Sequence, residues 1–293
     1  MHAPTIRPRS AIEIVDAAVS LFRDNFKTMA VIGLAASLPL AAMAVILGLG
    51  AFGRAAIDPE RFVAHPEAFV PSMIGMGIVV GLVMLFWMAV VDGAMTFAAA
   101  EAYHGRSPSP ADAYRGAINR GVSLVGGNLL RMLIVGGMVA VAGGAVALAA
   151  QANGFIAAII AIGVLVLMLH LLARTFAITS AIVIEDKSAS EGVQRSFFLS
   201  KDATLRIVGI AILCITIYTA VQAMGSFVIQ TVITLVLQRP IIAMVVANLA
   251  TMALYPFLNI AIMVLYYDQR VRKEGYDLDM MAGAIPAPSM PRG

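Results

Sequence analysis

Four ionisable side chains interrupt or border long apolar runs of this sequence: Asp92, Arg131, His170 and Arg174. A charged group surrounded by apolar residues is expensive, so each one is a hypothesis for a functional site. His170 and Arg174 are four residues apart and therefore share one face of a helix. We interpret the four as a polar cluster at the cytosolic mouth of a helix bundle, able to bind an anionic headgroup. Alternatively, they are separate interface anchors with one structural ion pair, and the arginines reach water by snorkelling.

Motifs of the common enzyme and metal-binding classes are missing from the sequence. None of its four histidines has a metal-ligand spacing. There is no G-x-S-x-G elbow or glycine-rich phosphate loop, and we find no nucleophile and base paired within the apolar runs. The basic residues are scattered between those runs, which does not favour nucleic-acid binding. We therefore predict a protein that is not an enzyme, uses no metal or cofactor and binds no nucleic acid.

The composition indicates that lipid, not water, surrounds much of the chain. Hydrophobic residues make up 60% of the 293 residues and charged residues 13%, with a mean hydropathy of +0.90. Soluble domains are about 45–50% apolar and about 25% charged. A membrane helix needs about 20 mainly apolar residues. The sequence predicts an all-α integral membrane protein with six transmembrane helices, at about 28–50, 72–92, 128–150, 155–174, 206–228 and 241–267.

The fifth apolar run is too long for one upright span, because residues 207–238 carry no charge. We expect one span, a break at Gly225 and Ser226, and a second apolar piece over 229–239 at the outer face. With both termini inside, 17 of the 20 Lys and Arg residues fall in inner segments, as the positive-inside rule requires. The first 27 residues contain seven charged residues, so we expect no cleavable signal peptide.

The domain organisation follows from these spans. We expect a flexible N-terminus over 1–9, a six-helix membrane domain over 10–275 and a flexible Pro-rich tail over 276–293. Cys214 is the only cysteine, so an intrachain disulfide is impossible.

Three inner segments begin alike and favour an internal repeat. "SAIEIVDAAVSLF", "SPADAYRGAINRG" and "SASEGVQRSFFLS" each start with a serine and have an acid three residues later, the spacing of a capping box. The serine and acid pairs are Ser10 with Glu13, Ser109 with Asp112, and Ser188 with Glu191. We predict three units, each an amphipathic surface helix followed by a two-helix hairpin. The alternative is that these are ordinary helix caps, which every helix start needs.

Apolar and glycine spacings predict how these helices pack. In the first surface helix the apolar face of Ile12, Val15, Val19, Phe22 and Phe26 favours a helix lying along the membrane surface. Small residues four apart favour close helix approach within the bundle, or a contact between two copies of the chain. These are Gly77 and Gly81 in the second span, and Gly136, Ala140 and Gly144 in the third.

The stretch "YYDQRVRKEG" (266–275) ends the last apolar run and predicts a membrane anchor. Asp268 with Arg272, and Arg270 with Glu274, are pairs four residues apart on a helix, and Gly275 is a good C-terminal cap. We place Tyr266 and Tyr267 in the aromatic belt at the membrane interface. Pro256, earlier in the same run, could kink the helix.

Three segments resemble bacterial six-span membrane proteins related to the membrane domain of glycerophosphoryl diester phosphodiesterase. They are "LYYDQRVRKEGYDLDM", "RPRSAIEIVDAAVSLFRDNF" (7–26) and "AIVIEDKSASEGVQRSFFLSKD" (181–202). Where this family usually has a proline near Ser180, this chain has none. The residues that match the cytosolic motifs are Glu185, Arg195, Ser196, Tyr267, Asp268, Arg270, Arg272, Glu274 and Gly275. In fused relatives, a soluble barrel that is absent here carries the catalysis, so the resemblance implies no phosphodiesterase activity.

The sequence and the resemblance together lead to two functional hypotheses. The first is a non-enzymatic scaffold or lipid-interacting accessory subunit of the bacterial plasma (inner) membrane, with both termini cytoplasmic. Its expected partners are the lipid bilayer, anionic lipid headgroups and another membrane protein. The alternative is a small transporter or channel whose polar mouth lies near Asp92, Arg131, His170 and Arg174.

Overall fold

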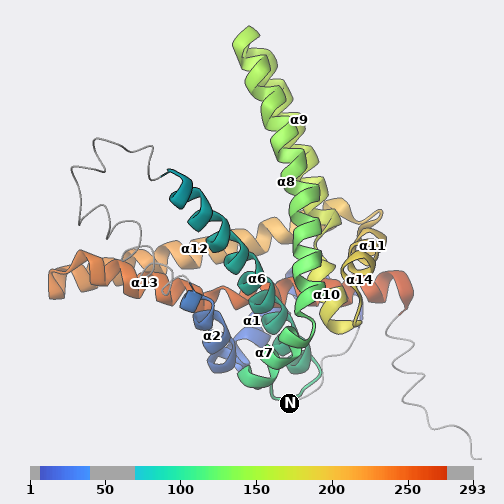
Figure 1. The fold of residues 1–293 in the computed structure, drawn as a ribbon. Helices are drawn as coiled ribbons and strands as arrows, with labels where there is room; N and C mark the ends of the chain where they lie inside the picture. Colours follow the sequence, from blue (N-terminus) through green and yellow to red (C-terminus); the bar gives the residue numbers. More distant parts are fainter. Residues whose placement is uncertain (1–6, 40–69, 276–293) are drawn as a thin grey trace, which may run out of the picture.

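The computed structural model describes residues 7–39 and 70–275, and its regular elements there are all α-helices (Figure 1). Five helical segments of this part are long and apolar enough to cross a membrane: Ile74–Tyr103, Gly121–Ala152, Gly154–Ile184, Thr204–Leu237 and Ile242–Glu274. The expected all-α fold class is therefore confirmed for the described residues, and the five segments indicate a multi-pass membrane protein. A shorter apolar helix, Phe26–Pro39, covers the beginning of the first expected span. Residues 40–50 of that span lie outside the described part. Residues 1–6 of the expected N-terminal segment 1–9, and the whole of the expected tail 276–293, also lie outside it.

The helices form a core from which apolar arms project (Figure 1). Up to residue 174 they are α1 (Ala11–Asp24), α2 (Phe26–Ala35), α6 (Val70–Tyr103), α7 (Pro110–Asn119), α8 (Gly121–Ala152) and α9 (Gly154–Arg174). Beyond residue 174 they are α10 (Ile178–Ile184), α11 (Ala189–Ser200), α12 (Thr204–Leu237), α13 (Pro240–Leu254) and α14 (Pro256–Glu274).

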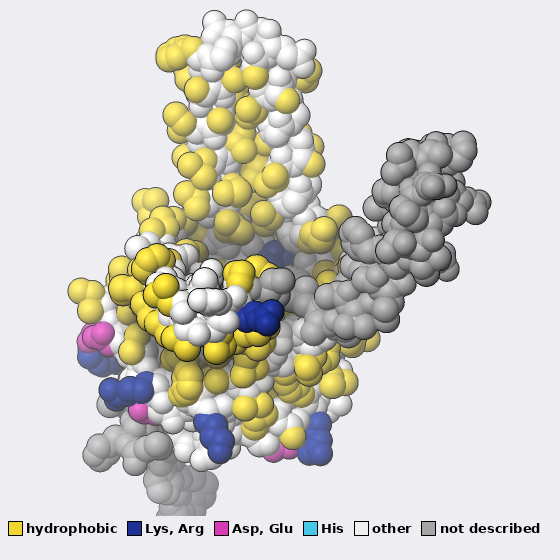
Figure 2. All heavy atoms as spheres, turned by 90° about the vertical axis from the view of Figure 1, so that its left-hand side faces the viewer, with side chains coloured by type: hydrophobic (Ala, Val, Ile, Leu, Met, Phe, Trp, Pro, Cys, Tyr) yellow, Lys and Arg dark blue, Asp and Glu magenta, His cyan; other side chains and the backbone are white. Residues whose placement is uncertain are grey.

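The arms are the α8–α9 hairpin, the α12–α13 hairpin and the outer half of α6, and they point in different directions (Figure 1). Their side chains are apolar on all sides and largely exposed: Val141 is 78% exposed and Leu235 75%. A helix that is apolar all round requires an apolar medium or partner. Figure 2 shows hydrophobic side chains along the upright arm, while most of the visible charged side chains lie on the core below.

The core lies where the arms meet, and three helices contact one another inside it. These are α10, α14 and the C-terminal half of α6. Met95, Ile182 and Met263, one from each helix, are at most 1% exposed. Around them, α1 packs on α14, α7 on α6, and α11 on α10 and α8. Each of α1, α7 and α11 therefore packs on a core helix that belongs to a different arm or directly follows it.

Two of the three expected capping boxes form. Ser10 with Glu13 opens α1, and Ser188 with Glu191 opens α11, each with both reciprocal hydrogen bonds. At α7, the serine before Pro110 makes no side-chain cap bond. The carboxylate of Asp112 instead accepts a hydrogen bond from Arg115 at 3.1 Å. Aspartate is one methylene shorter than glutamate, which disfavours the reach back to the cap.

The fifth apolar run differs from the expectation. Helix α12 is continuous from Thr204 to Leu237, so the expected break at Gly225 and Ser226 is wrong. An isolated glycine costs a helix only about 1 kcal/mol, which the surrounding apolar helix formers offset. The turn comes instead at Gln238, whose φ of 51° is left-handed, and Pro240 then opens α13. The run 229–239 thus completes one long helix and its turn.

The other helix bounds extend the predicted spans. Helix α6 continues eleven residues past position 92, and α8 begins seven residues before position 128. The last run is divided at Tyr255 between α13 and α14, as Pro256 predicted. Each extension carries its helix into the core, where tertiary contacts stabilise turns that a hydropathy window ignores.

Helix α1 docks on the core by a face that only partly overlaps the one expected to lie on the membrane, since Val15 and Phe22 of the expected face contact the core. Ile14, Val15 and Ala18 are buried, whereas Ile12 is 69% and Val19 44% exposed. Because α1 packs on α14, the apolar stripe is shared between the core and the outside.

The glycine ladders do not mediate the close contacts. A Cβ added at Gly77, Gly81 or Gly144 would meet nothing within 4 Å of the described chain, and at Gly136 it would meet only Met132 of the same helix. The expected close packing of these faces within the bundle is therefore not found.

Close approach occurs at other glycines. A Cβ at Gly33 would lie 2.4 Å from the carbonyl oxygen of Met252, and one at Gly192 would lie 2.9 Å from Ile182. The small residues that matter therefore lie where α2 and α11 meet their neighbours near and within the core.

Candidate functional site

Asp92 of α6 is half-buried and faces Tyr255, which lies at the junction of α13 and α14. The hydroxyl of Tyr255 donates a hydrogen bond to its Oδ1 at 3.2 Å. Asn259 of α14 contacts α6 nearby, because its Nδ2 lies 3.2 Å from the sulfur of Met95. Arg131 of α8 lies near enough to attract the Asp92 carboxylate electrostatically.

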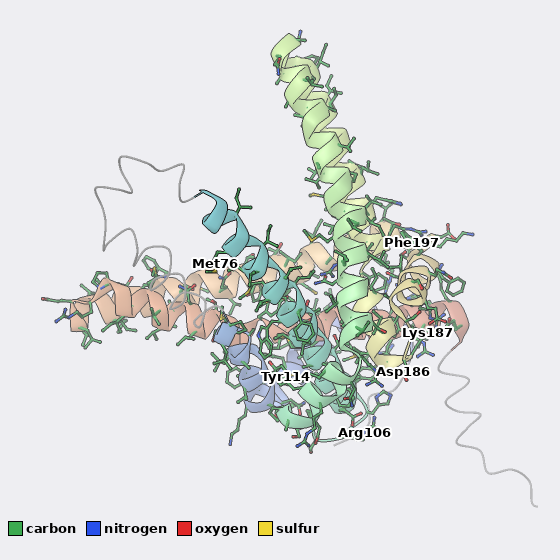
Figure 3. All side chains as sticks on the ribbon, viewed as in Figure 1. Met76, Arg106, Tyr114, Asp186, Lys187 and Phe197 are labelled. Carbon is green, nitrogen blue, oxygen red and sulfur yellow. The ribbon has the colours of Figure 1, made fainter. Side chains whose placement is uncertain are left out.

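Of the three other predicted mouth residues, Arg131 lies near Asp92, and His170 and Arg174 do not. Arg131 donates a hydrogen bond to Asn128 at 3.0 Å on its own helix. His170 is exposed on α9. Arg174 lies over the ring of Phe197, which Figure 3 labels on α11, at 4.7 Å from the ring centre. The structure thus brings Asp92 and Arg131 near each other and places His170 and Arg174 in other surroundings.

The residues of the predicted sequence motifs, by contrast, do converge, although they are far apart in the chain. Arg195 of α11 donates hydrogen bonds to Glu185 at 2.8 Å and to Glu274 at 2.8 Å. Arg270 pairs with both carboxylates, at 3.4 and 3.3 Å, and the hydroxyl of Tyr266 donates to Glu185. We call these five residues the Glu185 network. It joins α10, α11 and α14, and its charged side chains are 13–23% exposed.

A second cluster of charges ties the start of the chain to α14. Asp268 is fully buried and accepts hydrogen bonds from Arg206 at 2.7 Å and Arg272 at 3.0 Å. Its other oxygen accepts from the backbone N–H of Arg9 at 2.7 Å. Both arginines also donate to the carbonyl oxygen of Arg9. We call this the Asp268 network.

Ser196, the remaining motif residue of α11, holds the junction between α9 and α10. Its hydroxyl donates to the carbonyl oxygen of Arg174 at 2.7 Å and accepts from the N–H of Ala177 at 3.0 Å. The side chain is buried, and the two backbone groups lie where α9 ends and α10 has not yet begun. The serine thereby satisfies helix-end groups that have no partner within the helices.

The placement of Tyr266 and Tyr267 in an interfacial belt is wrong. They are 0% and 1% exposed, because the end of α14 is enclosed by the core. Tyr267 stacks on Tyr103 of α6, with ring centres 4.9 Å apart and planes 5° from parallel. The guanidinium of Arg9 lies over the ring of Tyr103. Gly275 ends α14 with a left-handed φ of 64°, as expected of a C-terminal cap.

These networks are built to hold helices together. In the described part of the chain, their carboxylates are engaged by arginines, and no group of three or more His, Cys, Asp or Glu residues could hold a metal ion. Burial alone would lower the pKa of the Arg195 guanidinium, but hydrogen bonds and charge from Glu274 and Glu185 raise it above its usual value. Arg195 therefore stays charged. Carboxylates saturated in this way are poor candidates for general bases.

The sequence did not single out Arg9, Tyr103 or Arg206 as site residues. In the sequence, Arg206 is the last charged residue before a long apolar run, and only the fold brings it to Asp268. No family model, curated protein or solved structure matches the chain.

Proposed function

We propose that the protein is a non-enzymatic scaffold or lipid-interacting accessory subunit whose arms lie in the membrane and whose core faces the cytosol. The observation that carries this proposal is the division of the molecule into unpartnered apolar arms and a core of neutralised, buried charges. The arms require an apolar medium, and a lipid bilayer supplies it. The core offers a stiff surface on which a partner could dock.

The rigidity of the core supports a scaffold. The Glu185 and Asp268 networks fix α10, α11 and α14 together and bind the segment before α1 to the last helix. Multidentate arginine contacts restrict geometry more than single bonds do. Arginines on the outside of this core, such as Arg115 at 77% exposure, would face anionic headgroups or a partner protein.

We further propose six spans, both termini in the cytoplasm and a threefold repeat. The packing of α1 on α14, α7 on α6 and α11 on α10 is cyclic, which favours three related units. We also propose a relationship to bacterial six-span inner-membrane proteins. Two of the segments that resemble this family contain Glu185 and Asp268, and the matching residues around them form the two networks, which supports the relationship.

A transporter or channel is the second candidate, and one observation favours it. Asp92 accepts a hydrogen bond from Tyr255 and lies near the charge of Arg131, within segments able to cross a membrane. Ionisable groups at such depth often mark a transport path.

Thiol accessibility in proteoliposomes separates the two functions. In a Cys214→Ser background, Ala94→Cys and Ala98→Cys place thiols on α6 where side chains are 0% exposed. Ser190→Cys on the exposed side of α11 is the reactive control. With a scaffold, a membrane-impermeant thiol reagent labels the control and neither α6 position. Labelling of either α6 position at a rate near that of the control would show a hydrated path and contradict the scaffold.

A further inference from the structure

We propose that a cavity between α9, α12 and α14 holds one acyl chain of an anionic phospholipid, whose phosphate accepts hydrogen bonds from Arg131. This inference rests on the proposed lipid-interacting function and names the ligand class and the site.

The cavity has a volume of about 280 Å³ and is lined almost entirely by apolar side chains. Leu172 and Phe176 come from α9 and the turn after it, Ile207 and Ala211 from α12, and Leu258 and Ala261 from α14. Small-molecule pockets start at about 300 Å³, so this space suits a segment of one chain and not a whole lipid.

Its position argues for a lipid occupant. The walls belong to three of the segments that can cross a membrane. A buried water needs 2–4 polar partners, which such walls do not supply, so an apolar occupant is favoured. A chain that moves from the bilayer into the cavity gains little hydrophobic free energy, because both surroundings are apolar. Affinity must therefore come from packing against fixed walls and from a polar anchor.

Arg131 is suited to be that anchor, because it is the charged residue of the cavity lining. Its Nη2 donates to Asn128, while the hydroxyl of Tyr255 donates to the neighbouring Asp92. A guanidinium has five N–H donors in a fork that fits two phosphate oxygens. An anionic phosphate is the complement that leaves these donors satisfied.

The test uses the full-length protein in nanodiscs of phosphatidylcholine with a trace of phosphatidylglycerol carrying a photoactivatable diazirine at the end of one acyl chain. Cross-linked peptides are then mapped by mass spectrometry. We expect labels on the cavity segments of α9, α12 and α14, reduced by an excess of unlabelled phosphatidylglycerol. This competition is measured on the wild-type chain and does not depend on how any variant folds.

Two pairs of variants divide the site into its parts. Ala211→Trp fills the cavity and should abolish labelling there, whereas Ala220→Trp on the exposed side of α12 should leave it unchanged. Arg131→Gln should reduce labelling by about tenfold, as expected for the loss of charge-assisted hydrogen bonds. Arg239→Gln, at the exposed turn between α12 and α13 and outside the cavity lining, is the matched control.

Equal labelling in Ala211→Trp and Ala220→Trp would overturn the cavity as the chain site. Labelling that a phosphatidylcholine probe matches in yield would overturn the anionic headgroup. Either result combined with unreactive thiols at Ala94→Cys and Ala98→Cys would leave the scaffold proposal standing while this inference fails.

Discussion

Replacing Asp268 by asparagine should loosen the attachment of the N-terminal helix to the core. The carboxylate is fully buried and binds Arg206, Arg272 and the backbone N–H of Arg9. Asparagine keeps the shape and can still accept from Arg9 through its oxygen. Its amide group would then face the arginines, so donors would meet donors.

The magnitude follows from the contacts that are lost. Hydrogen bonds to charged groups contribute about 1.5–3 kcal/mol each, and breaking a fully buried ion pair costs about 3–5 kcal/mol. Arg206 and Arg272 are 30% and 34% exposed, so water can partly resolvate them once released. We therefore expect Asp268→Asn to lower the free energy of unfolding by about 2–3 kcal/mol, or to lower the melting temperature by roughly 4–12 °C.

The assay is thermal unfolding in detergent, with hydrogen exchange measured on peptides covering 7–24. Because Asp268 holds Arg9, exchange in α1 should accelerate more than exchange in α7. Asp112→Asn is the matched control: its exposed pair with Arg115 should contribute about 0–0.5 kcal/mol. If both variants shift stability equally, or if α1 exchanges at the wild-type rate in Asp268→Asn, the reasoning is refuted.

Three other predictions test the local structure. Ser196→Ala should cost about 1–3 kcal/mol and speed amide exchange at Ala177, because two junction groups lose their partner; unchanged exchange would contradict this. Gly33→Ala should destabilise by about 1–3 kcal/mol in thermal unfolding, because its Cβ would meet a backbone oxygen, whereas Gly144→Ala should be neutral or stabilising; equal shifts would contradict it. Hydrogen bonds from Ser188 hold the pKa of Glu191 below its usual 4.5, so the cap is fully stabilising above that pH and weakens as pH falls through the lowered value. The exchange difference in α11 between wild type and Glu191→Gln should therefore shrink on acidification, and a constant difference would argue against the capping role.

The sequence by itself determined the local features of this protein. Apolar runs of this length require lipid-compatible helices, and their positions are recovered in α6, α8, α9 and α12. Two capping boxes, the break at Pro256, the i,i+4 pairs of α14 and the cap at Gly275 also follow from spacing alone. Each of these is decided within a few residues of chain, where spacing fixes geometry.

Only the tertiary structure decided which groups meet. Asp268 and Arg206 are 62 residues apart, and Arg195 and Glu274 are 79 apart, so no periodicity predicts their pairing. For the same reason, Tyr266 reads as an interfacial residue in the sequence and is buried in the structure. A sequence records how apolar each segment is, whereas the partner of a charge depends on how helices cross. The four residues predicted to form one polar mouth lie in different surroundings, and the two charged networks consist of other residues. The reason is that burial and pairing are properties of the assembled core.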